Sequence, residues 1–131
     1  MGGRPKILIV DDDPAVRASL AFSLELEGFL TETFDCGEEL AAKGELPPGG
    51  CLVLDYHLPG MDGLSLLQLL RTRDVLLPAV LITSNPTRTV RGRAKEAGAV
   101  LVEKPLLCDS LTRALIAALS GQAGQVVSEA Q

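Results

Sequence analysis

The segment Cys51–Gly63 reads CLVLDYHLPGMDG, and it contains the change from strand to helix that decides the fold. It begins with an apolar run that is too short for a helix and is typical of a strand buried on both faces of a parallel sheet. Asp55 ends that run, and Pro59 and Gly60 then predict a loop. Leucines recur at helical spacing from Leu64 onward. The segment therefore predicts a strand, a loop that opens with a carboxylate, and a helix.

The same alternation recurs on both sides of this segment. Apolar runs at Ile7–Val10, Ala79–Ile82 and Val100–Val102 predict further buried strands, and the alternating segment Leu30–Phe34 predicts an edge strand. Helical spacing and helix-end signals predict helices from Pro14 to near Gly28, over Glu38–Lys43, from Leu64 to near Arg73, over Arg88–Ala97, and from Asp109 or Ser110 to Leu119. Five strands that alternate with five helices predict an α/β fold, with a doubly wound parallel sheet and helices on both faces.

Length and composition exclude several classes of protein. The chain has 131 residues, which indicates one domain, and a hydrophobic fraction of 47% with 22% charged residues excludes a disordered chain. The net charge of -5 argues against direct nucleic-acid or membrane-surface binding, and no apolar run is long enough to span a membrane. Three cysteines without metal-site spacing, and no signal-peptide pattern, favour the cytoplasm. We expect a single domain over residues 1–120 and a short, flexible tail over 121–131.

Polar side chains follow the predicted strands at the point where each strand ends. They are Asp11 and Asp12 after the first strand, then Asp55, Thr83 and Lys104. Because parallel strands end at one edge of a sheet, we expect these side chains to meet there. Carboxylates brought together repel by about 4 kcal/mol per pair at ~4 Å, which predicts a cation that offsets this cost. All candidate ligands are oxygen atoms, so Mg²⁺ is the expected ion and Mn²⁺ the second candidate. A lysine and a hydroxyl beside that ion suit a phosphoryl group.

Four motifs resemble those of the receiver domain of two-component response regulators. They are Ile9–Pro14 (IVDDDP), Leu54–Gly63 (LDYHLPGMDG), Ile82–Ser84 (ITS) and Glu103–Pro105 (EKP), and the resemblance extends from Lys6 to about Leu119. The second motif, combined with the later Lys-Pro pair, is the most specific. The resemblance implies a flavodoxin-like, five-stranded parallel sheet in the order 2-1-3-4-5 with five helices.

The resemblance also implies roles for the residues at the strand ends. Asp55 is expected to accept a phosphoryl group from the phosphohistidine of a histidine kinase, with Thr83 and Lys104 in contact with the phosphoryl oxygens. The expected ligands of Mg²⁺ are Asp11, Asp12, Asp55 and the backbone carbonyl of His57. Such a domain is a phosphoacceptor and not a turnover enzyme. Its expected partners are a sensor histidine kinase or a phosphotransfer protein, and an output protein or domain that the sequence does not identify.

Two positions depart from the common pattern of that family. Leu101 stands where the family usually has an aromatic residue, three positions before the lysine, and Ser84 stands where the family has a smaller residue. The coupling between phosphorylation and the outer surface is therefore expected to differ from the usual one. Neither departure alters the chemistry expected at Asp55.

Simpler roles stand beside some of these assignments. Asp13 before Pro14 favours a helix cap over a metal ligand, and Asp62 is expected to cap the helix that follows it. His57 and Asn85 lie where the family tunes the loss of the phosphoryl group, and ordinary surface residues are the alternative. For the whole chain, one alternative is a receiver-like interaction module that signals without phosphorylation. Another is a phosphatase with an aspartate nucleophile, which would need an acid–base Asp where His57 stands.

Overall fold

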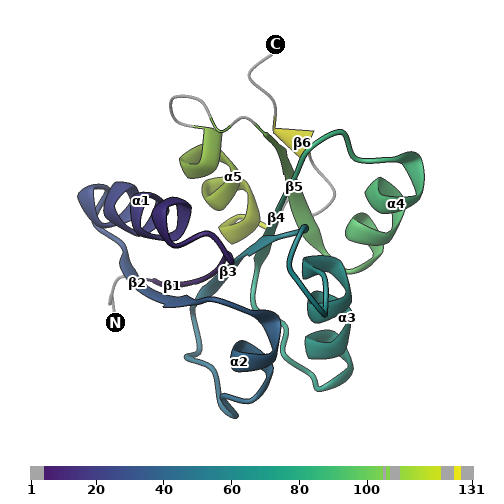
Figure 1. The fold of residues 1–131 in the computed structure, drawn as a ribbon, viewed down its shortest axis with the longest axis horizontal. Helices are drawn as coiled ribbons and strands as arrows, with labels where there is room; N and C mark the ends of the chain where they lie inside the picture. The colour runs from purple at the N-terminus through teal and green to yellow at the C-terminus, as the bar shows by residue number, and fades with distance from the viewer. Residues whose placement is uncertain (1–4, 105, 107–109, 122–125, 128–131) are drawn as a thin grey trace.

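A computed structural model describes residues 5–104, 106, 110–121 and 126–127 of the chain (Figure 1). The strands are β1 (Lys6–Val10), β2 (Leu30–Phe34), β3 (Cys51–Asp55), β4 (Ala79–Thr83), β5 (Ala99–Glu103) and β6 (Val126–Val127). The helices are α1 (Pro14–Leu26), α2 (Gly37–Ala41), α3 (Gly63–Thr72), α4 (Arg88–Glu96) and α5 (Ser110–Leu119). Each predicted strand and helix is present, with its ends close to the predicted ones.

The strands form one parallel sheet in the order β2-β1-β3-β4-β5-β6. The first five strands follow the order 2-1-3-4-5, which confirms the flavodoxin-like topology.

The strand β6 is an addition to the five predicted strands. It lies within residues 121–131, for which we expect a flexible tail, and it pairs with Leu101 and Val102 of β5. Two consecutive valines favour a strand, and the open edge of β5 offers them unpaired backbone groups. Most of the tail lies outside the described residues, so its flexibility stays a prediction.

Each face of the sheet is covered by its own layer of helices (Figure 1). On one face, Leu20 and Leu24 of α1 and Leu115 of α5 form a buried cluster with apolar side chains of β1, β3, β4 and β5. On the other face, α2, α3 and α4 bury a cluster rich in leucine. The segment Ile7–Val10 is at most 1% exposed, as expected for a strand covered on both faces. Among the described helices, none is both long and apolar enough to cross a membrane.

Two aspartates begin the helices beside the acidic edge of the sheet. The Asp13 side chain accepts hydrogen bonds from the first turn of α1, and the Asp62 side chain accepts one from the first turn of α3. These contacts confirm both predicted caps. Asp109, one of two predicted starts of the last helix, lies outside the described residues, and α5 begins at Ser110, the other.

The strand order places a crevice between β1 and β3. These strands are neighbours, but β2 lies beyond β1 and β4 lies beyond β3, so the loops that follow them run in opposite directions. Such a reversal leaves a binding crevice at the carboxyl ends of the strands. Asp11 directly follows β1 and Asp55 ends β3, so the topology brings them to this point.

Candidate functional site

The loop after β1 holds carboxylates in different environments. Asp11 is 4% exposed, and its Oδ1 accepts a hydrogen bond from the Asp13 N–H at 2.9 Å. Arg17, in the first turns of α1, donates from Nη1 to the backbone carbonyl of Asp11 at 2.7 Å and ties the loop to the helix. Asp12 is exposed. Asp13 is engaged as the helix cap, which leaves Asp11 and Asp12 as the candidate metal ligands of this loop.

Asp55 lies deep in the crevice and is 5% exposed. The His57 N–H donates to Asp55 Oδ1 at 3.2 Å, so the loop after β3 orients the carboxylate. Gly63 allows α3 to begin directly against this strand, because a Cβ atom there would lie 2.3 Å from the backbone oxygen of Asp55. Gly60 has a φ of 76°, a backbone conformation that residues other than glycine rarely adopt. The two glycines thus shape the turn that aims Asp55.

Lys104 follows β5 and contacts Asp55 directly. Its Nζ lies 3.3 Å from Asp55 Oδ1 and 3.4 Å from Asp55 Oδ2. The Lys104 backbone N–H donates to the Thr83 carbonyl at 2.8 Å, which fixes the end of β5 against β4. The contact joins a buried carboxylate to a lysine whose side chain is about one third exposed.

Thr83 ends β4, and its hydroxyl is engaged with the backbone of the next residue. Thr83 is 1% exposed, and its hydroxyl donates to the backbone carbonyl of Ser84 at 3.4 Å. Ser84, rather than Thr83, lines the cleft described below. Thr83 is thus buried at the end of β4, next to the cleft residue Ser84.

Three carboxylates converge in the crevice. Asp11, Asp12 and Asp55 each offer one oxygen atom, and these atoms lie within 4.8 Å of one another. Burial raises the pKa of Asp11 above its usual value, opposed by the hydrogen bond from the Asp13 backbone, and repulsion from Asp55 raises this pKa further. Crowded negative charge on hard oxygen donors fits a divalent cation such as Mg²⁺.

These side chains line an open cleft of about 770 Å³. Its polar wall consists of Asp11, Asp12, Asp13, Asp55, His57, Ser84 and Lys104, and its apolar wall of Val16, Leu20, Ile82 and Leu106. The volume is typical of sites for small ligands. The sequence predicts most of the polar wall, because those residues follow the strands. It does not predict the apolar wall, which comes largely from outside the strands.

Two further residues differ from what the sequence alone suggests. The contact of Arg17 with the Asp11 carbonyl has no sequence signal, because an arginine on an amphipathic helix normally faces solvent. Leu101, at the position where the resemblance calls for an aromatic residue, is 2% exposed and packs in the core beneath α3 and α4.

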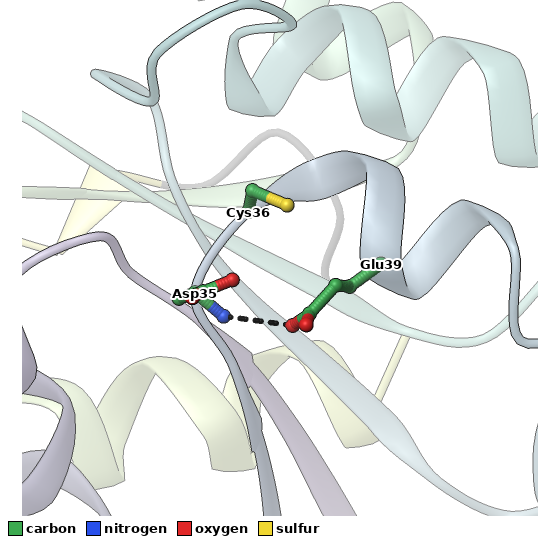
Figure 2. Close-up of side chains that lie close together, drawn as sticks. All are labelled: Asp35, Cys36 and Glu39. Atoms are coloured by element: carbon green, nitrogen blue, oxygen red, sulfur yellow. Dashed lines mark hydrogen bonds between the residues drawn. The ribbon is translucent and has the colours of Figure 1, made fainter.

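A second group of candidate metal ligands lies at the start of α2. Figure 2 shows Asp35, Cys36 and Glu39, whose ligand atoms lie within 4.8 Å of one another. Glu39, in the first turn of α2, accepts a hydrogen bond from the N–H of Asp35, the residue before the N-cap Cys36, at 3.2 Å. The helix is short: it ends at Ala41, ahead of the predicted Lys43, and the chain turns at Gly44 with a φ of 84°. The local hydrogen bond accounts for the approach of Glu39 to Asp35, and both carboxylates are exposed, so we assign no metal to this group.

Comparisons with known proteins agree on one family. Residues 7–116 match the family model of the response regulator receiver domain. The chain is 36% identical over 115 residues to the C4-dicarboxylate transport transcriptional regulatory protein DctD of Pseudomonas aeruginosa. The matched region covers 84% of this chain and 25% of that protein. It is 33% identical over 128 residues to the transcriptional regulatory protein FixJ of Bradyrhizobium diazoefficiens. This matched region covers 95% of this chain and 61% of that protein. The chain thus spans only part of the length of both relatives.

Solved structures show the same arrangement of strands and helices. The crystal structure of FixJ-N superposes with a TM-score of 0.81 at 32% identity, over 91% of this chain and 96% of that chain. A CheY-like response regulator receiver domain protein from Methanospirillum hungatei superposes with a TM-score of 0.81 at 28% identity, over 92% of this chain and 97% of that one.

Proposed function

The chain belongs to the response regulator receiver domain family, and on this premise we propose that Asp55 accepts a phosphoryl group from the phosphohistidine of a sensor histidine kinase or a phosphotransfer protein. The observation that carries the proposal is the contact of Lys104 with Asp55, 3.3 Å apart, beside the carboxylates of Asp11 and Asp12. Asp55 is a buried carboxylate next to a lysine and two further carboxylates. Such a group is suited to receive a phosphoryl group when the carboxylates hold a divalent cation. Receiver domains are signalling domains, so the modified chain is the signal rather than an intermediate in a turnover reaction.

The transfer is a single substitution at phosphorus. A carboxylate oxygen of Asp55 forms a bond to phosphorus while the bond from phosphorus to the imidazole nitrogen breaks, and the electron pair of the broken bond stays on the imidazole. Asp11, Asp12, Asp55 and the backbone carbonyl of His57 are the proposed ligands of Mg²⁺, which when bound supplies positive charge to the phosphoryl oxygens. Lys104 contributes a second positive charge, 3.3 Å from Asp55 Oδ1.

Thr83 supplies the proposed link from the modified Asp55 to the surface. Its hydroxyl donates to the Ser84 carbonyl at 3.4 Å, which is a long hydrogen bond. A phosphoryl oxygen is a charged and therefore stronger acceptor, so we expect the hydroxyl to turn toward it and draw the loop after β4 along. The result is a shift between two populations of the domain. Because Leu101 is a buried aliphatic residue, this shift proceeds without the usual aromatic partner.

The output partner is proposed in general terms only. The relatives DctD and FixJ are transcriptional regulators, and this chain spans only part of each, so an attached domain or a separate protein would carry the output. The net charge of -5 disfavours direct contact of this domain with nucleic acid. We place the chain in the cytoplasm, with its phosphohistidine donor.

The proposal is tested by intact mass after incubation with phosphoramidate and with acetyl phosphate, in the presence and absence of Mg²⁺. We expect a Mg²⁺-dependent gain of one phosphoryl group in the starting protein and none in Asp55→Asn. Asp62→Asn is the matched control, because asparagine caps a helix as well as aspartate does. It should gain the group as the starting protein does.

Persistent gain of one phosphoryl group in Asp55→Asn would contradict the assignment of the acceptor. If Mg²⁺ binds but no donor, including a phosphorylated kinase, modifies the chain, the second candidate is favoured: an interaction module that signals without phosphorylation.

A further inference from the structure

The loop after β1 is held to the start of α1 by the side chain of Arg17. The guanidinium donates from Nη1 to the backbone carbonyl of Asp11 at 2.7 Å. Arg17 lies in the first turn of α1, where its own N–H donates to the carbonyl of the capping residue Asp13 at 2.9 Å. The two hydrogen bonds join the helix to the acidic loop at two points, so the position of Asp11 depends on that of α1.

The carbonyl that Arg17 holds belongs to the peptide group between Asp11 and Asp12. A peptide group is close to planar, so fixing its oxygen atom also fixes the direction in which the chain enters Asp12. Asp11 is held at two further points: its N–H donates to the Phe34 carbonyl at 3.2 Å, and its Oδ1 accepts from the Asp13 N–H at 2.9 Å. Of these three bonds, only the one from Arg17 is supplied by a side chain outside the loop.

Asp12 has fewer restraints of its own than Asp11. It is exposed, and among the residues that the structure describes its carboxylate has no hydrogen bond or ion pair. One of its oxygen atoms nevertheless lies within 4.8 Å of an oxygen atom of Asp11 and of one of Asp55. A carboxylate without such partners depends on its backbone for its position, and the peptide group before Asp12 is the one that Arg17 holds.

Arg17 does not serve as a direct counter-charge for these carboxylates. Its side chain is half-buried, and it forms no ion pair with any described carboxylate, whereas Lys104 forms one with Asp55. A positive charge near a cation site weakens cation binding by repulsion, but a fixed arrangement of the ligands strengthens it. The charge of Arg17 and its hydrogen bond therefore have opposite expected effects on cation affinity, and an experiment can separate them.

We infer that Arg17 is a positioning residue of the cation site: through the Asp11 carbonyl it holds the carboxylates of Asp11 and Asp12 in the arrangement that binds Mg²⁺. The inference rests on the proposed function, because it concerns the Mg²⁺ that the phosphorylation of Asp55 requires. Removal of a partner that orients metal ligands costs about tenfold to a hundredfold in metal affinity. Because Asp11 keeps its two other hydrogen bonds, we expect the lower end of this range.

The test measures the dissociation constant of Mg²⁺ from the amide chemical shifts of the isotope-labelled protein, which also show whether each variant is folded. Arg17→Met removes the donors and keeps a long side chain with good helix propensity. Arg17→Lys keeps the charge and one donor group with a shorter reach. Arg93→Met is the matched control: it changes the net charge equally and removes a hydrogen bond between two helices, from Arg93 Nη2 of α4 to Gln68 Oε1 of α3 at 2.9 Å.

We expect Arg17→Met to raise the Mg²⁺ dissociation constant about tenfold, Arg17→Lys to raise it less, and Arg93→Met to leave it unchanged. Phosphorylation of Asp55 by phosphoramidate in Arg17→Met should need about tenfold more Mg²⁺ to reach half of its maximal rate. The maximal rate itself should stay unchanged, because saturating Mg²⁺ restores the occupied site. A general loss of structure would lower the maximal rate instead.

An unchanged or lower dissociation constant in Arg17→Met would overturn the inference, and so would an equal rise in Arg93→Met. If Arg17→Met does not fold, Arg17→Lys decides alone, and a dissociation constant equal to that of the starting protein would overturn the inference. Absence of Mg²⁺ binding in the starting protein would instead contradict the proposed function itself.

Discussion

Gly63 lies directly against the backbone of Asp55. A Cβ atom at residue 63 would lie 2.3 Å from the backbone oxygen of Asp55 and 2.9 Å from its carbonyl carbon. Neither atom can rotate away, so Gly63→Ala must displace α3 or the end of β3. We expect this variant to lose about 1–3 kcal/mol of unfolding free energy, measured by urea denaturation. Phosphorylation of Asp55 by phosphoramidate should slow by about tenfold to a hundredfold, because the attacking carboxylate moves.

Gly92 provides the opposite case within the same chain. It lies in α4, and a Cβ atom there would meet nothing within 4 Å. Gly92→Ala should therefore raise the unfolding free energy by about 1 kcal/mol through helix propensity and leave the rate at Asp55 unchanged. If Gly63→Ala matched Gly92→Ala in both measurements, the close approach at Asp55 would not matter for the site.

Cys51 makes stability depend on pH in the alkaline range. The residue is fully buried in β3, and burial raises the pKa of its thiol from 9.0 to about 12. Below about pH 9, the thiol is protonated in both the folded and the unfolded chain. Above that pH the unfolded chain loses the proton first, so the unfolding free energy falls by at most about 1.4 kcal/mol per pH unit until the folded pKa is reached. Urea denaturation from about pH 8 to pH 10.5 measures this decline.

Cys51→Ala isolates the contribution of this thiol. The variant loses core packing at every pH, but its alkaline decline should be shallower than that of the starting protein, because the titrating group is gone. Cys36→Ala, at the start of α2, keeps Cys51 and should show the original decline. Identical slopes in Cys51→Ala and the starting protein would mean that the folded chain does not protect this thiol from ionisation.

At the scale of elements, the sequence predicts what local chemistry determines. The caps at Asp13 and Asp62 could be predicted because their hydrogen bonds reach only two or three residues along the chain. The buried strands could be predicted because each is a continuous apolar run between turn signals. The acidic part of the site follows from those strands, since Asp11 and Asp55 come directly after them.

Contacts between distant elements could not be predicted in this way. Arg71 of α3 donates to the Ala97 carbonyl at the end of α4, at 2.7 Å, and to the carbonyls of Val75 and Leu77 before β4, at 2.9 and 2.8 Å. Burial lowers the pKa of this guanidinium from its usual value. A long side chain selects its acceptors only after the elements have packed. For the same reason, the contact of Arg17 with the Asp11 carbonyl and the apolar wall of the cleft could not be predicted from the sequence. The strand β6 depends likewise on the edge that β5 leaves open.

At the scale of the whole molecule, only the folded chain assembles the acidic site. Asp11 and Asp12 follow β1, Asp55 ends β3, and the parallel pairing of these strands brings their carboxylates together. Folding therefore brings three carboxylates together against their mutual repulsion. The pKa of Asp11 is raised mainly by burial, and repulsion from Asp55 and Asp12 raises it further. A cation bound among them would relieve this repulsion in the folded state and would find no comparable site in the unfolded chain.

Mg²⁺ should therefore stabilise the fold, and its removal should reverse the effect. A ligand that binds only the folded state adds about 2.7 kcal/mol at one hundred times its dissociation constant, which corresponds to a rise in Tm of several degrees. We expect a thermal melt with Mg²⁺ to show this rise and excess EDTA to abolish it. Asp12→Asn removes an exposed member of the cluster and should lose most of the rise. Asp13→Asn removes a neighbouring charge while asparagine keeps the helix cap, so it should retain most of the rise. Equal losses in both variants would indicate a general effect of negative charge rather than coordination by Asp12, and no rise in the starting protein would contradict a cation site in this cleft.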